Sequence, residues 1–84
     1  MLSGKYNFHS MKNNKPAYIS QGVGFKGIYH YLVWYDKCWY IQDGEWFFEG
    51  KPGGYFYISA SGKYSYQFEN SLDINVLSIL YSRY

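Results

Sequence analysis

The most regular hydrophobic pattern in the chain predicts a β-hairpin over residues 28–43, IYHYLVWYDKCWYIQD, with its reversal at Asp36 and Lys37. If Tyr35 and Cys38 close this turn, one face carries the cross-strand pairs Trp34–Trp39, Leu32–Ile41 and His30–Asp43. The other face then carries Tyr29, Tyr31, Val33, Tyr35 and Tyr40. We expect the first face to form the core. The second is too rich in tyrosine for ordinary solvent contact, so we expect it to be an interaction surface.

Further strands are predicted on both sides of this hairpin. Residues 4–8 and 17–20 read as short strands around an Asn-Asn and proline turn, and a glycine-rich loop at 21–27 follows them. A second hairpin is predicted over residues 55–68, with a three-residue loop at 61–63. That loop would pair Ala60 with Tyr64, Ile58 with Tyr66 and Phe56 with Phe68.

Residues 70–81 allow two interpretations. Leu72, Val76, Ile79 and Leu80 fit one face of a helix, whereas Leu72, Ile74 and Val76 alternate as in a strand. The pattern favours a short helix, because Ser78 and Leu80 break the alternation. The sequence therefore predicts one all-β or β-dominated domain over residues 1–84. We expect a small barrel or twisted antiparallel sheet of five or six short strands, with or without a C-terminal helix.

The composition limits the classes of function. Aromatic residues make up 25% of the chain, its net charge is only +2, and its lysines and arginines are scattered, which does not favour nucleic-acid binding. One cysteine excludes an internal disulfide, and with two histidines it is too sparse for a zinc site, so we expect no metal and no cofactor. The N-terminus lacks the apolar run of a secretory signal, which predicts an intracellular protein unless the chain is a processed fragment. No stretch is long and apolar enough to predict a transmembrane segment.

Three groups of residues could suggest chemistry, and each has a simpler structural interpretation. GVGFKG at 22–27 has the glycine spacing of a dinucleotide-binding loop, but it leads into a predicted strand where that motif needs a helix. Cys38 and His30 would face opposite sides of the hairpin, so they do not form a nucleophile and base. His30 opposite Asp43 resembles a catalytic fragment, but it lacks a nucleophile. The sequence therefore predicts no enzyme.

The segment DGEWFFEGKPGG, residues 43–54, is the strongest candidate contact loop. Side chains alternate along an extended chain, so Trp46, Phe47 and Phe48 could not all face one core. We expect at least one of the three to be displayed, and Glu45 and Glu49 to keep the tip soluble. One alternative is that the loop folds back and covers an open barrel end. The other is that it binds a protein or a sugar ring, because displayed aromatic side chains are frequent at interaction hot spots.

The fragments GKY, NNKPAY, YHYLVWY, CWYI and GGYFYI, within residues 4–60, carry one resemblance. Their order resembles that of short aromatic β repeats with Gly-x-Tyr, Asn-Gly-Lys/Arg-Pro-x-Tyr, Tyr-Leu-x-Tyr, Trp-x-Ile and Gly-x-Tyr-Tyr motifs. Asn14 stands where that pattern has glycine. Such repeats occur in large multidomain, often extracellular eukaryotic proteins, and the resemblance implies a non-catalytic module.

Two main functional hypotheses follow. The first is a structural or protein-interaction module that assembles with itself or a larger complex through Tyr29, Tyr31, Tyr35, Tyr40, Trp46, Phe47 and Phe48. The second is a carbohydrate-binding module in which Trp46 and nearby tyrosines stack on sugar rings while Gln42, Asp43 and Glu45 bond hydroxyls. Stacking of single-stranded nucleic acid is a weaker third, because no basic groove accompanies the rings.

Overall fold

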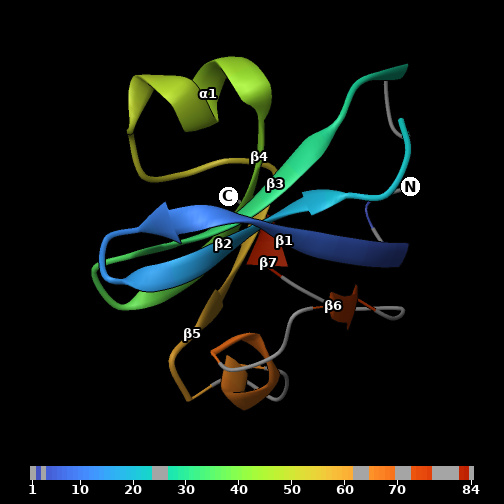
Figure 1. Ribbon diagram of the computed structural model, residues 1–84. Helices are drawn as coiled ribbons and strands as arrows, with labels where there is room; N and C mark the ends of the chain where they lie inside the picture. The colour runs from blue at the N-terminus through green and yellow to red at the C-terminus, as the bar shows by residue number, and fades with distance from the viewer. Residues whose placement is uncertain are drawn as a thin grey trace.

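The protein folds as one strongly twisted antiparallel sheet with a short helix packed on it (Figure 1). The computed structural model describes residues 2, 4–23, 27–61, 65–69, 73–76 and 82–83. The strands in chain order are β1 (Gly4–Lys12), β2 (Lys15–Ser20), β3 (His30–Tyr35), β4 (Cys38–Asp43), β5 (Phe56–Ser59), β6 (Asp73–Val76) and β7 (Ser82–Arg83). They are ordered β6-β1-β2-β3-β4-β5-β7 across the sheet. The predicted β-dominated fold is confirmed, and the two-residue β7 takes the number of strands in the described residues to seven.

The sheet is built on two tight hairpins that the turn residues determine. Asn13 and Asn14 both have positive φ, 55° and 67°, as the turn between β1 and β2 requires, and asparagine tolerates that conformation. Asp36 does the same at the β3–β4 turn, where Tyr35 pairs with Cys38. The predicted register is therefore confirmed, including the pairs Trp34–Trp39, Leu32–Ile41 and His30–Asp43.

One face of the sheet carries the main core, as the hairpin pattern predicts. Its buried members are Tyr6, Tyr18, Leu32, Trp39, Ile41, Ile58, Phe68, Ile74 and Val76. Two tyrosines are accommodated because each hydroxyl finds a carbonyl: Tyr6 donates to Leu2 and Tyr18 to Phe68, both at 2.7 Å. Their rings thus contribute apolar area without leaving an unpaired polar group.

The predicted second hairpin is wrong. β5 pairs with β4, which places Ile58 opposite Trp39, and β7 lies on the other side of β5. Ser65–Phe68 form a 3-10 helix instead of a returning strand. Residues 62–64, which include two of the three residues of the expected loop at 61–63, lie outside the described residues. The Phe68 ring packs edge-on against Trp39, with ring centroids 5.3 Å apart. Contact with the core therefore overrides the local alternation.

The helix favoured for residues 70–81 is also wrong where the structure describes this segment. Asp73–Val76 form β6, which pairs antiparallel with β1 and places Ile74 opposite Tyr6. Ile74 and Val76 are buried while Asp73 and Asn75 are exposed, so burial follows the two-residue period of a strand and not the period of a helix. Residues 70–72 and 77–81 lie outside the described residues.

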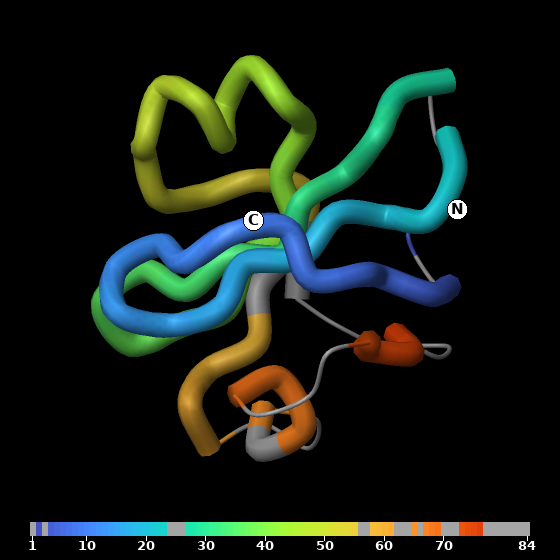
Figure 2. The backbone as a smooth tube through the Cα atoms, in the orientation of Figure 1, coloured from blue at the N-terminus to red at the C-terminus, as the bar shows by residue number. Residues whose placement is uncertain are grey.

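The only α-helix among the described residues is α1 (Gly44–Glu49), and it begins directly after β4. It packs on the second face of the sheet through Phe47, whereas Phe68 packs on the first face. The backbones of α1 and of the 3-10 helix Ser65–Phe68 accordingly lie on opposite sides of the sheet (Figures 1 and 2). Within the part of the chain that the structure describes, no helix has the length and apolar character needed to cross a membrane.

Candidate functional site

The aromatic segment at residues 46–48 is helical, and this decides where its three rings lie. The Asp43 carboxylate caps the first turn of α1 by accepting the Trp46 N–H at 3.1 Å. Gly50 ends the helix in the left-handed conformation, with φ of 75°, and its N–H bonds the carbonyls of Phe47 and Trp46. Successive helical side chains point about 100° apart. Neighbouring rings therefore face the sheet, the solvent and the adjoining loop.

Phe47 is the ring that faces the sheet. It is only 2% exposed and stacks on Tyr31, with ring centroids 4.3 Å apart and an interplanar angle of 7°. Lys12 from β1 places its ammonium 4.5 Å from the centre of the Phe47 ring and donates to the Phe47 carbonyl at 3.1 Å. The His9 ring lies edge-on to Phe47 with centroids 5.6 Å apart. The segment therefore folds back through Phe47, as one alternative expected, but it covers a face of the sheet where that alternative placed an open barrel end.

The expectation that the tyrosine-rich sheet face is a free interaction surface needs correction. Tyr31 and Tyr40 are buried with Ala17, Val33 and Phe47 in a second core cluster, and Tyr35 is half-buried beside it. Burial raises the pKa of Tyr31, and the neighbouring Tyr29 hydroxyl raises it further. Tyr29, in the segment before β3, is 47% exposed and is the member of the set that solvent reaches most. α1 of the same chain covers this apolar face and removes it from water, so the face needs no partner for that purpose.

The prediction of a displayed ring is confirmed by Phe48, which is 66% exposed. Phe48 stands edge-on to Tyr31, with centroids 5.6 Å apart, and edge-on to Phe47, with centroids 5.2 Å apart. Trp46 is 37% exposed on the other flank of α1. Its indole N–H donates to the Pro52 carbonyl at 3.1 Å, which holds the ring in one orientation.

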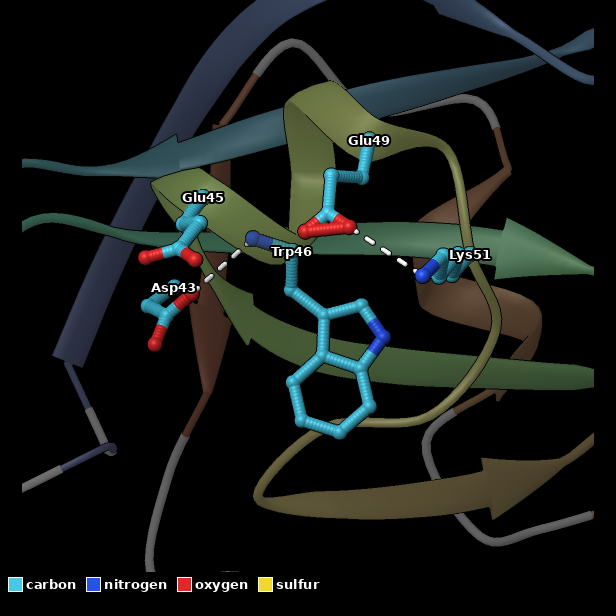
Figure 3. Close-up of a pocket in the computed structure, with 5 residues that line it drawn as sticks. All are labelled: Asp43, Glu45, Trp46, Glu49 and Lys51. Carbon is cyan, nitrogen blue, oxygen red and sulfur yellow. Dashed lines mark hydrogen bonds and ion pairs between the residues drawn. The ribbon is translucent and has the colours of Figure 1, made fainter.

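Two hollows lie on either side of Asp43 and Glu45, which line both of them. The first, of about 290 Å³, is completed by Trp46, Glu49 and Lys51. Its indole lies between the Asp43 and Glu45 carboxylates on one side and the Glu49–Lys51 ion pair on the other (Figure 3). The second, of about 350 Å³, is completed by Ile28, Tyr29, Tyr31 and Gly44. We call α1, its cap Asp43 and these two hollows the α1 surface.

The Gln42 side chain holds the loop after α1 in place through hydrogen bonds to its backbone. This side chain is fully buried and donates to the carbonyls of Lys51 and Gly53, at 2.6 and 2.7 Å. Gln42 therefore positions the loop and is not available to a ligand, contrary to its expected role at a sugar site. Asp43 is also occupied on both oxygens, since it caps α1 and accepts the Tyr55 hydroxyl at 3.3 Å. Glu45 is exposed and makes no ion pair with a residue that the structure describes.

The charge of the α1 surface is opposite to that of the whole chain. It holds three of the six carboxylates, Asp43, Glu45 and Glu49, and one ammonium, Lys51, for a local net charge of −2. The chain as a whole carries +2, so the remaining residues together carry +4. This contrast favours a ligand with positive charge over an anion.

The other residues considered from the sequence do not assemble a reactive centre. Cys38 packs with the cluster beneath α1, while His30 lies at the far end of the hairpin, paired in register with Asp43. The described residues include no group of three or more His, Cys, Asp or Glu that could hold a metal ion. Residues 24–26 of the glycine-rich loop lie outside the described residues, and the chain enters β3 at His30.

Two contributors to the site were missed from the sequence. Tyr55 belongs to the site because its hydroxyl donates to Asp43. Burial raises the pKa of Tyr55, and the Asp43 carboxylate raises it further. Gly54, with φ of 147°, lets the chain pass so close to β4 that a Cβ there would collide with the Ile41 carbonyl oxygen. The Gly53–Gly54 pair was the available signal, because paired glycines often mark a close backbone approach. Comparison of the chain with protein-family models, curated proteins and solved structures found no match.

Proposed function

We propose that this chain is a non-catalytic protein-interaction module that binds a second copy of itself, or a subunit of a larger complex, through the α1 surface. The exposure of Phe48 carries the proposal. This phenylalanine is 66% exposed on a helix that is held in place on the sheet by its buried neighbour Phe47. A fixed, displayed ring loses little conformational entropy when a partner covers it.

The surroundings of Phe48 support the same function. Exposed Tyr29 and Trp46 provide two further amphipathic rings, and tyrosine and tryptophan are enriched at interaction hot spots. The charge of −2 on the α1 surface and of +4 on the remaining residues also lets one copy attract another. The resemblance to aromatic repeat modules agrees with a non-catalytic role.

The test is the solution mass of the protein by light scattering on a sizing column, over a tenfold concentration range. We expect a species heavier than the 10.0 kDa chain, and we expect Phe48→Ser to shift it toward that mass. Loss of a buried interface ring costs about 2 kcal/mol, or roughly thirtyfold in Kd. Met11→Ser is the matched control, because Met11 is 63% exposed but is adjacent to Lys12 in β1 and so points away from α1. A 10.0 kDa protein at every concentration removes self-association.

A second candidate, carbohydrate binding, is favoured by Trp46. Its partly exposed indole is oriented by Pro52 and lies beside the carboxylates of Glu45 and Glu49, as a stacking platform with adjacent hydroxyl acceptors. Screening of soluble glycans against the wild type and Trp46→Ala tests it. Binding that survives the loss of the indole contradicts this function.

A further inference from the structure

The hollow beside Tyr29 is more than a gap between acidic side chains. Tyr31 lines it and is only 8% exposed, and its hydroxyl makes no hydrogen bond with another residue that the structure describes. The side chain therefore borders the hollow with little of its surface exposed. The hydroxyl is not one of the buried polar atoms without a partner, so it keeps contact with solvent and can bond a ligand that enters the hollow. Tyr29 adds a second ring that is 47% exposed.

The chemistry of the lining selects a cation. Tyr29 supplies an exposed, electron-rich ring, whereas the Tyr31 ring is stacked on Phe47 and offers its hydroxyl; Asp43 and Glu45 line the same space with carboxylates. Neither nearby lysine lines this hollow: Lys51 lines the other one, where it is paired with Glu49 at 3.2 Å, and the Lys12 ammonium is bonded to the Phe47 carbonyl. Aromatic faces and carboxylates together suit guanidinium better than ammonium, because guanidinium is planar, is weakly hydrated and binds carboxylate through two parallel hydrogen bonds.

We propose that the hollow lined by Tyr29, Tyr31, Asp43 and Glu45 binds an arginine side chain of the partner protein. The guanidinium stacks on Tyr29 and donates to the Glu45 carboxylate, to the Tyr31 hydroxyl and to the lone pairs of Asp43 that its bonds to Trp46 and Tyr55 leave unused. This inference rests on the proposed function, because it identifies which side chain of a protein partner enters the α1 surface. It adds a polar anchor to the apolar contact made by Phe48.

Gly44 offers a way to fill the hollow without disturbing the fold. A Cβ added there would lie 3.5 Å from Tyr31 Cε1 and 3.8 Å from Phe48 Cε2, both ordinary van der Waals distances. Gly44 is also the first residue of α1, where alanine is a better helix former than glycine. Gly44→Ala should therefore narrow the hollow while leaving the free energy of unfolding unchanged or raised.

The experiment is an NMR titration of the ¹⁵N-labelled protein, at low salt and at a concentration where it is monomeric. The probe is the blocked peptide Gly-Gly-Arg-Gly-Gly, and its control has citrulline, a neutral group of the same shape, in place of arginine. We expect amide shifts at residues 28–31 and 43–45, with citrulline binding at least about tenfold more weakly. Gly44→Ala and Glu45→Gln should each weaken the arginine peptide about tenfold, whereas Glu49→Gln, in the other hollow, should not.

Three results would overturn the inference: equal binding of the arginine and citrulline peptides, no effect of Gly44→Ala and Glu45→Gln, or no shift at these residues. Shifts there with cellobiose but not with the arginine peptide would overturn it in favour of a glycan. The titration measures peptide binding to the monomeric protein, so its result does not depend on whether the protein self-associates. A protein that associates through Phe48 but ignores the arginine peptide keeps the proposed function and loses this inference.

Discussion

Phe47→Ala tests whether α1 is held on the sheet by one ring. Phe47 is 2% exposed, stacks on Tyr31 and lies beneath the Lys12 ammonium. Truncation of a buried phenylalanine to alanine costs about 3 to 5 kcal/mol. A domain of 84 residues has a total stability of roughly 4 to 13 kcal/mol, so this single change removes a large part of it. A six-residue helix has too few internal hydrogen bonds to persist without this contact.

The assay is urea denaturation followed by tryptophan fluorescence, with Phe48→Ala as the matched control. Phe48 is the next residue of the same helix, undergoes the same substitution and is 66% exposed, so we expect a loss below about 1 kcal/mol. Phe47→Leu should fall between them, because it keeps most of the apolar volume but loses the stack on Tyr31. Equal losses for the two alanine variants would refute the argument that burial beneath α1 stabilises the fold.

Two further predictions concern backbone geometry and pH. Gly54→Ala should lower the free energy of unfolding by at least about 2 kcal/mol, because its Cβ would collide with the Ile41 carbonyl oxygen. Gly50→Ala should lower the free energy of unfolding by only about 1 kcal/mol, because φ is 75° but no atom lies near the added Cβ. Both variants are compared by chemical denaturation, and equal losses of stability for the two would argue against the collision at Gly54. Burial raises the pKa of Tyr18 from 10.0 to about 12, so the folded state holds this proton more tightly and stability falls as pH rises from 10 toward 12. Tyr18→Phe should make that fall shallower in pH-dependent denaturation, and parallel curves would mean that Tyr18 does not cause it.

The sequence was sufficient where structure depends on neighbours along the chain. The β3–β4 register follows from a two-residue turn at Asp36 and Lys37 together with a strict period of two, and both are local properties. The same reasoning failed for Phe68 and Ile74, whose positions are decided by Trp39 and by β1, which are distant in the chain. For Phe68 the local alternation indicated a strand that contact with Trp39 overrides; for Ile74 the alternation of a strand was present, and pairing with β1 decides between it and the helical pattern.

The helix at residues 44–49 was missed for a different reason. Six residues are too few to show a helical period, and the three consecutive rings read equally well as an extended tip. Asp43 and Gly50, seven positions apart, were the available cap signals. They become decisive only once Phe47 has a surface to bury against, which the buried Tyr31 supplies.

This dependence links the fold of α1 to its proposed function. The helix that displays Phe48 and lines both hollows is fastened mainly through Phe47 and its two caps, so its local opening should require less free energy than unfolding of the sheet. A ligand that needs the closed helix therefore stabilises it by mass action, by about 2.7 kcal/mol at a hundred times its Kd. Amide exchange of residues 44–50 should slow when such a ligand binds, while exchange in β3 and β4, where the core fixes the strands, should change little. The ring that closes the tyrosine face is thus also the one that determines whether the α1 surface exists to be bound.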